Sequence, residues 1–244
     1  AWIGEAQDQA TDNLAWIQNH IYSNPAVHYY FGDLQGDKWT KAEFTTTNGC
    51  RMIAKGTSQR LRGKKQYSTR YTGIILDDFE SELNTKTPES RQQIKDWVTA
   101  AVYPAIDFDK NGFLWCNGTI VHYDSFLNGL VKNHQQAEKS GEEYSWKIVT
   151  YKAILEDGSP LWPSRWPLKK LEERKQFYID SGTPAKFYQE YMNQAKSPED
   201  QIFSEDDITD GFYSGNVRFD DEADSWYIKF EDGSITNGVC RPDI

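Results

Sequence analysis

Short apolar runs and helical repeats alternate along the first 200 residues, as they do in proteins built on a parallel sheet. Strand-like runs are expected at residues 1–4, 73–77 and 112–117, and helices at residues 8–22, 88–102 and 124–132. The pair Asn48-Gly49, the strongest short hairpin signal, lies between strand-like stretches at 43–47 and 50–54. These elements predict an α/β fold with a mostly parallel sheet flanked by helices.

The rest of the chain is divided by turn-forming residues. Residues 23–40, which hold Pro25, Gly32 and Gly36, are expected to form a loop. The other expected elements are a strand pair at 146–157, helices at 167–179 and 183–194, and a short β pair at 217–219 and 226–230. The pattern predicts three parts: a core at 1–160, a helical subdomain at 161–198 and an acidic linker at 199–244.

The net charge of −10 is concentrated in the last part. Residues 199–244 hold thirteen acidic and three basic residues, so the preceding residues are balanced in charge. Global acidity therefore does not exclude nucleic-acid binding by the first part of the chain. No apolar run approaches the roughly 20 residues of a membrane span and no signal-peptide pattern is present, so a soluble, intracellular protein is expected. The three cysteines, Cys50, Cys116 and Cys240, lack the spacing of a zinc site or a disulfide framework.

Two adjacent carboxylates, Asp77 and Asp78, follow the apolar run that begins at Gly73. An acidic pair at the tip of a buried parallel strand predicts a cation site. In P-loop nucleotide hydrolases an Asp at this place holds Mg²⁺, and a neighbouring carboxylate orients the attacking water. A strand that ends in a turn, where Asp caps the next segment, has the same pattern.

The segment that leads into this strand is strongly basic. Residues 51–70 contain seven basic residues and no acidic one, among them Arg62, Lys64 and Lys65. Arginine beside an acidic strand tip suits the stabilisation of charge on a transferring phosphate. A solvated loop, or one that grips DNA phosphates through Lys64 and Lys65, is the alternative interpretation.

Several motifs, taken in their order and spacing from residue 1 to about residue 196, resemble one family. They are Glu5-Ala6-Gln7-Asp8-Gln9-Ala10, Leu61-Arg62-Gly63, Ile75-Leu76-Asp77-Asp78-Phe79-Glu80, Gly118-Thr119 before His122-Tyr123-Asp124-Ser125, Leu161-Trp162-Pro163, and Phe187-Tyr188-Gln189-Glu190-Tyr191-Met192. The chain is similar to the large terminase subunit of tailed phages, the ATP-driven motor that packages DNA. This resemblance implies a sheet of the P-loop NTPase type, in its RecA-like (ASCE) branch.

The resemblance also implies roles for single residues. Asp77 matches the Walker B aspartate that acts on Mg²⁺, and Asp78 matches the carboxylate that polarises water, with Glu80 as a competitor for that task. Gly118-Thr119 resembles the coupling motif that senses the γ-phosphate of ATP. Arg62 resembles the arginine finger, acting on its own site or on that of a neighbour.

Two parts of the family pattern are missing from these 244 residues. The P-loop pattern G-x-x-x-x-G-K-[ST] does not occur, and the nearest match, Gly56 to Lys65, has its glycines too far apart. The family's P-loop precedes the strand at residues 1–4, so the chain is expected to be cut at its N-terminus. The family's nuclease domain, which cuts DNA with metal ions, would begin after Ile244. Alone, the chain is expected to hydrolyse ATP weakly or not at all.

The implied partners follow from the packaging reaction. They are double-stranded DNA, a portal protein, a small terminase subunit and further copies of the chain in a ring, in the cytoplasm of an infected bacterium and transiently at the procapsid portal. Two alternatives stay open. One is another P-loop motor, such as a helicase, and the other is a non-catalytic module that binds nucleic acid or protein and retains a degenerate ATPase fold.

Overall fold

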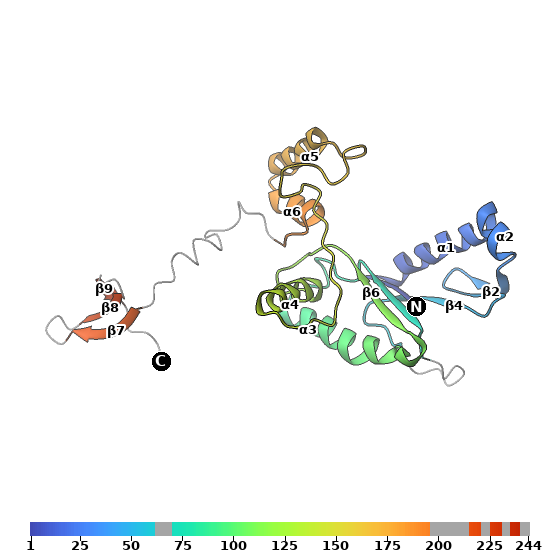
Figure 1. The fold of residues 1–244 in the computed structure, drawn as a ribbon, viewed down its shortest axis with the longest axis horizontal. Coiled ribbons are helices and arrows are strands. Elements are labelled where there is room, and N and C mark those ends of the chain that lie inside the picture. Colours follow the sequence, from blue (N-terminus) through green and yellow to red (C-terminus); the bar gives the residue numbers. More distant parts are fainter. Residues whose placement is uncertain (62–69, 196–214, 221–224, 231–234, 240–244) are drawn as a thin grey trace. The chain divides into compact units, whose positions relative to one another are not determined.

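The computed structural model describes residues 1–61, 70–195, 215–220, 225–230 and 235–239 (Figure 1). The chain divides into two compact units, Ala1–Ser197 and Pro198–Ile244. The first unit contains a six-stranded sheet with helices, and the second contains a three-stranded sheet. Each unit is described by itself below.

The sheet of the first unit has the strand order β2-β3-β4-β1-β5-β6. Its strands are β1 (Trp2–Gly4), β2 (Gln35–Thr40), β3 (Glu43–Thr46), β4 (Arg51–Gly56), β5 (Gly73–Asp77) and β6 (Phe113–Asn117). The neighbours β4-β1, β1-β5 and β5-β6 are parallel, whereas β2, β3 and β4 form an antiparallel meander. The predicted α/β fold with a mostly parallel sheet flanked by helices is therefore confirmed.

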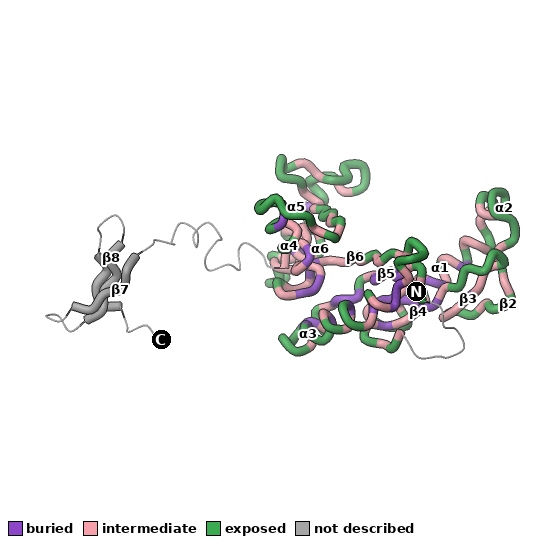
Figure 2. Tube along the Cα trace, turned by 60° about the horizontal axis from the view of Figure 1, so that its bottom comes forward, coloured by how far each residue is buried: buried purple, intermediate pink, exposed green. Residues whose placement is uncertain are grey.

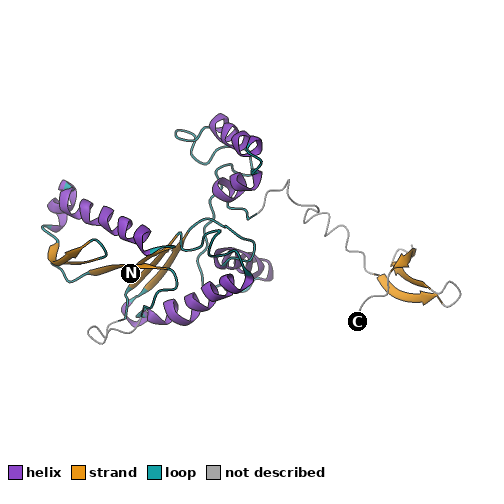
Figure 3. Ribbon diagram, turned by 180° about the vertical axis from the view of Figure 1, so that it is seen from behind, coloured by secondary structure: helices purple, strands orange, loops and turns teal. Residues whose placement is uncertain are grey.

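Helices lie on both sides of this sheet (Figure 3). Helices α3 (Pro88–Trp97) and α4 (Phe126–Ser140) cover one face and α1 (Gln7–Ser23) covers the other, and the unit also contains α2 (Pro25–Phe31), α5 (Leu168–Asp180) and α6 (Pro184–Met192). Helix α3 continues into a π-helical turn, Val98–Val102, and short 3-10 turns follow at Tyr103–Ala105 and Phe108–Lys110. Thr87 caps α3 because its side chain accepts a hydrogen bond from the backbone N–H of Ser90, as the sequence Thr87-Pro88 predicts.

The two faces of the sheet bury separate cores, which the purple segments of Figure 2 follow. Alternation along β1 sends Trp2 and Ile3 to opposite faces. On one face Ile3, Ile74 and Leu76 pack with residues of α3 and α4, including Ile94 and Phe126. The other face is covered by α1, and its buried residues are Ala10, Leu14, Phe44 and Ala54. The first core holds β5 through Ile74 and Leu76, and β1 contributes to both cores through Ile3 and Trp2.

Two predictions about local structure are wrong. Residues 23–40 are not a loop, because Asn24 caps α2, Pro25 occupies its first turn, and β2 pairs with β3. Residues 146–157 do not form a strand pair: in this stretch only Ile154 makes a bridge, to Pro160. A strand needs a neighbour for its backbone hydrogen bonds, and residues 146–150 have none among the described residues.

The second unit contains β7 (Gly215–Asp220), β8 (Ser225–Phe230) and β9 (Ile235–Val239) in an antiparallel sheet of that order. The predicted pair of strands near 217–219 and 226–230 is confirmed, and β9 adds a third strand that the sequence analysis missed. In the part of the chain that the structure describes, no helix is both long enough and apolar enough to cross a bilayer.

Candidate functional site

The carboxyl ends of β5 and β6 bring the acidic pair and the Gly118 segment together. Asp77 lies opposite Asn117 in the parallel ladder, and the backbone N–H of Asp78 donates to the carbonyl of Asn117 at 2.9 Å. Residues that follow adjacent parallel strands meet at the same edge of a sheet, which is where α/β proteins place their ligand sites. The structure therefore brings Asp77, Asp78 and Gly118, which were predicted on separate grounds, to one edge of the sheet.

The carboxylate of Asp77 is fixed by three uncharged donors. Its Oδ2 accepts hydrogen bonds from Trp2 Nε1 at 3.2 Å and from Asn13 Nδ2 at 3.0 Å. Its Oδ1 accepts from Asn117 Nδ2 at 3.0 Å. Within the described ranges no Lys or Arg forms an ion pair with Asp77 or Asp78. The described donors therefore orient the carboxylate of Asp77 without adding a positive charge beside it.

Asp78 has an unusual backbone and a perturbed acidity. Its φ of 46° lies in the left-handed region, which Asp tolerates better than most residues do. Asp78 is exposed, but neighbouring protein removes part of the hydration of its carboxyl group. This partial burial, together with the charges of Asp77 and Glu190, raises the pKa of the Asp78 carboxyl. A carboxylate with a raised pKa is better suited to accept a proton.

Gly118 leaves room for the Asp78 side chain. A Cβ atom at position 118 would lie 3.4 Å from Asp78 Oδ1 and 3.1 Å from Leu127 Cδ1. The absence of a side chain at Gly118 thus permits the backbone after β6 to approach the acidic pair. Thr119, which follows, is half-buried, and among the described residues its side chain makes no hydrogen bond.

Glu80 points away from this edge and serves another element. It is buried, at 5% exposure, and its two carboxylate oxygens accept the backbone N–H groups of Phe126 (2.7 Å) and Leu127 (2.9 Å) at the start of α4. Burial raises the pKa of Glu80, and these two hydrogen bonds oppose that rise. A carboxylate at a helix N-terminus satisfies donors that the helix itself leaves free. The geometry gives Glu80 a structural task.

Three of the predicted site residues, Arg62, Lys64 and Lys65, lie outside the described residues. The structure therefore contains no information about the predicted arginine finger or about the predicted DNA contacts.

The sequence analysis missed four residues that surround the acidic pair. Trp2 and Asn13 bond to Asp77, Asn117 bonds to both acids, and Glu190 of α6 raises the pKa of Asp78. Asn117 carried a usable signal, because it is the last residue of a strand directly before Gly118. Asn13 and Glu190 carried none, since their proximity depends on how α1 and α6 pack.

The donor set fits a Mg²⁺ ion better than it fits a fully protein-ligated metal. In the described part of the chain, no group of three or more His, Cys, Asp or Glu side chains converges to hold a metal. Mg²⁺ commonly binds through one or two carboxylates and keeps several waters or substrate phosphate oxygens. Asp77 and Asp78 supply two hard oxygen donors, and among the described residues neither forms an ion pair with Lys or Arg.

Comparisons with known proteins do not identify a family for this chain. No protein-family model matches the chain, and no curated protein matches it.

Proposed function

We propose that this chain is the core of a Mg²⁺-dependent ATPase that translocates double-stranded DNA, of the kind found in the large terminase subunit of tailed phages. The single observation that carries the proposal is the acidic pair at the end of β5, beside the end of β6. Hydrogen bonds hold the carboxylate of Asp77 in one orientation, and the pKa of the Asp78 carboxyl is raised. The resemblance of the motifs supplies the family, and the parallel sheet is compatible with a P-loop type of fold.

The two acids divide the proposed work. Asp77, held in one orientation by Trp2, Asn13 and Asn117, would hold Mg²⁺, which supplies electrostatic stabilisation to the phosphates of ATP. Asp78 would orient the attacking water and accept its proton. Asp78 is preferred to Glu80 for this role, because Glu80 is buried and attached to the start of α4, whereas Asp78 is exposed.

The proposal requires a phosphate cradle from outside these residues. Residues 1–244 contain no P-loop pattern, and no described cation lies within ion-pair distance of the acidic pair. Efficient ATP hydrolysis and DNA translocation would therefore belong to an assembly that supplies the P-loop, together with DNA, a portal protein and further copies of the chain. The step that the proposal assigns to residues 1–244 by themselves is the binding of Mg²⁺.

The test uses Mn²⁺, a paramagnetic substitute for Mg²⁺, and NMR of the whole chain. Mn²⁺ should broaden the signals of Asp77, Asp78 and Gly118 at lower concentration than those of the acidic second unit, and Mg²⁺ should reverse the effect. Asp77→Asn should abolish this selective broadening. The matched control, Asp12→Asn on the exposed side of α1, should leave it unchanged. Broadening confined to residues 198–244 would remove the metal step and the proposal with it.

A further inference from the structure

Residues 161–175 form a second basic segment of the chain. They contain five basic and two acidic residues, and they include the turn before α5 and the first part of that helix. Arg165, Lys169, Lys170 and Arg174 are exposed, and within the described ranges none of them forms an ion pair with Asp or Glu. Because its positive charge is not balanced locally, this segment attracts anions.

Two of these cations share one face of α5 with an exposed aromatic ring. Lys170, Arg174 and Phe177 follow one another at intervals of four and three residues, so they line one face of the helix. Phe177 is 59% exposed, whereas the neighbouring Leu171 is fully buried and belongs to the packed side of α5. Glu172, two residues from each of the two cations, lies on the opposite side of the helix. This face is therefore both basic and aromatic.

The turn before α5 adds two tryptophans to this face. Lys170 Nζ lies 4.3 Å from the centroid of the Trp166 ring, and Arg165 Cζ lies 5.7 Å from that of Trp162. Trp166 is half-buried and packs edge-on against Tyr191 of α6, whereas Trp162 is 57% exposed. Cation–π attraction thus holds both cations beside rings, and much of the Trp162 ring remains open to a further contact. We call Trp162, Arg165, Lys170, Arg174 and Phe177 the α5 surface.

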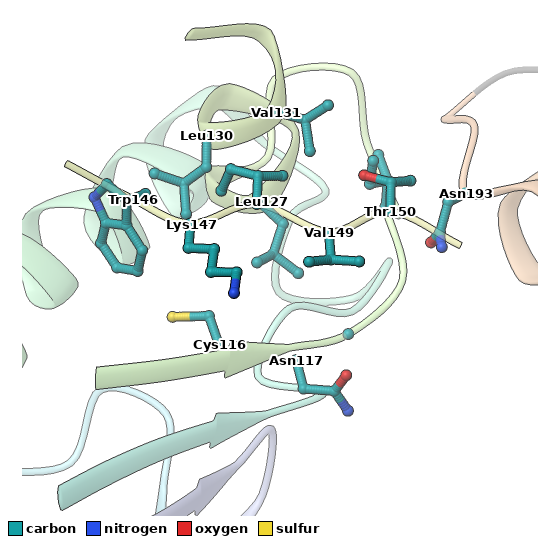
Figure 4. Close-up of a pocket in the computed structure, with 13 residues that line it drawn as sticks. Cys116, Asn117, Leu127, Leu130, Val131, Trp146, Lys147, Val149, Thr150 and Asn193 are labelled. Carbon is teal, nitrogen blue, oxygen red and sulfur yellow. The ribbon is translucent and has the colours of Figure 1, made fainter. Parts of the chain in front are cut away.

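Helix α6 attaches the α5 surface to the part of the fold that holds the acidic pair. Gln189 Nε2 donates to the carbonyl of Val121 at 3.0 Å, and Asn193 Nδ2 donates to the carbonyl of Tyr151 at 2.8 Å. Asn193 also lines a pocket of about 130 Å³ whose other lining residues include Asn117, the last residue of β6 (Figure 4). The α5 surface is therefore joined to the core of its unit through a helix that ends beside β6.

We infer that the α5 surface binds single-stranded nucleic acid. Arg165, Lys170 and Arg174 contact the phosphates, and unpaired bases stack on the exposed rings of Trp162 and Phe177, as on other platforms that combine basic and aromatic side chains. In a duplex the faces of each base are covered by its neighbours, so these rings favour an unpaired strand. This binding needs neither Mg²⁺ nor the acidic pair, and it is separate from the predicted contacts of Lys64 and Lys65 with double-stranded DNA.

Fluorescence anisotropy of the full chain at physiological salt tests the inference. The probes are labelled oligothymidylate and oligouridylate of about twelve nucleotides, a length within the site sizes of such platforms, and comparison of the two distinguishes DNA from RNA as the ligand. Lys170→Glu combined with Arg174→Glu should weaken the binding of these strands by about tenfold or more. The slope of log affinity against log salt should fall by about 1.4, because two phosphate contacts are lost.

The stacking contact has its own variant. Trp162→Ala should weaken binding of the single strands by about tenfold, leave the salt slope unchanged and leave binding of a duplex of the same length unchanged. Trp162→Phe, which retains an aromatic ring, should lose less. Lys132→Glu combined with Lys139→Glu, at exposed positions of α4, is the matched charge control. It should change the affinity less than about twofold, since salt screens charges that do not contact the strand. Circular dichroism checks that each variant is folded.

Four results would overturn the inference. They are unchanged affinity in the α5 charge variant, equal losses in the α5 and α4 charge variants, an equal effect of Trp162→Ala on duplex and single strand, and binding of polyglutamate as tight as that of the strands, which would identify an acidic polypeptide as the occupant. Asp77→Asn should bind the single strands like the unaltered chain. A failed metal site and a failed α5 surface therefore give distinguishable results.

Discussion

Asp78 combines a left-handed backbone conformation, which is uncommon for residues other than glycine, with a carboxyl group whose pKa is raised. The backbone occupies the left-handed region at φ 46°, and the carboxyl is partly removed from water beside Asp77. Buried neighbours on both sides impose this arrangement, since Leu76 and Phe79 are fully buried. Strain of this kind persists where the surrounding structure over-determines a residue, which is common at functional sites. This residue is therefore the most informative one to titrate.

Glu190→Gln should lower the pKa of Asp78 toward its ordinary value. The substitution removes one of the negative charges that disfavour ionisation of Asp78, while its burial and Asp77 remain. The proton-accepting form of Asp78 would then appear at lower pH, and any activity that needs it would begin at lower pH. Carboxyl ¹³C NMR titration measures the change. Glu173→Gln on the exposed face of α5 is the control, and an unshifted Asp78 midpoint in Glu190→Gln would contradict the described position of α6.

Single residues also show where sequence analysis stops. Asp77 and Asp78 were predicted from an acidic pair at the tip of an apolar strand, and Gly118 from the resemblance to the terminase coupling motif. Glu80 is acidic like Asp77 and Asp78, yet its carboxylate binds the start of α4. The reason is that the chain turns at Asp78 and buries both Phe79 and Glu80. Distinguishing Asp78 from Glu80 requires that turn, which no local pattern in the sequence specifies.

At the scale of elements, the link between β5 and α4 passes through Glu80. The carboxylate accepts the first two backbone N–H groups of α4, and Ser125 accepts that of Asn128 at 3.2 Å. The helix N-terminus is thereby attached to the segment that follows the acidic pair. Helix α4 also provides Leu127, which limits the space beside Gly118. A change at Glu80 should therefore be felt in both stability and site geometry.

Glu80→Ala should lower the free energy of unfolding by about 2 kcal/mol, because two buried donors lose their acceptor. Urea denaturation followed by tryptophan fluorescence measures the loss. Glu80→Gln, which retains one acceptor oxygen, should lose less. The exposed Glu82 is the second control, and Glu82→Ala should change stability little, since its contact with Lys186 is at the surface. Equal losses for Glu80→Ala and Glu82→Ala would show that Glu80 does not support α4.

The elements that were predicted correctly have a strong local signal. Thr87-Pro88 marks the start of α3, and Asn48-Gly49 joins β3 to β4 in antiparallel register. Helix α2 carried a comparable signal in Asn24-Pro25, which the surrounding aromatic residues and glycines obscured. The failure at residues 146–157 is of a different kind. Strand propensity was present there, but a strand also needs a partner, and sequence propensity does not supply one.

At the scale of the whole molecule, charge is segregated between the two units. The segment 199–244 carries the entire net charge of −10, while the preceding residues are balanced. An acidic segment on the same chain competes with DNA for the basic residues of the stretch 51–70, and salt screens this competition. The second unit should therefore weaken any DNA binding by the first.

A chain that ends at Ser197 should bind double-stranded DNA about tenfold more tightly than the full chain at low salt, and the difference should shrink as salt rises. Fluorescence anisotropy with a labelled duplex measures both affinities, and circular dichroism checks that the shortened chain is folded. Lys64→Glu with Lys65→Glu should remove the gain, because these lysines are the proposed phosphate contacts. Equal affinities for the two chains at low salt would refute the proposed competition between the acidic segment and DNA.

The central position of β1 in the sheet has a consequence during synthesis, because β1 precedes both of its neighbours in the sequence. This three-residue strand is made well before its neighbours β4 and β5, which begin at Arg51 and Gly73. Ribosomes add roughly 5–20 residues each second, so β1 and α1 wait for seconds without the sheet they pack on. A nascent chain in this interval exposes Ile3 and Leu14, which are fully buried in the folded protein. The interval between synthesis of β1 and synthesis of β5 is therefore one in which chaperone protection should matter.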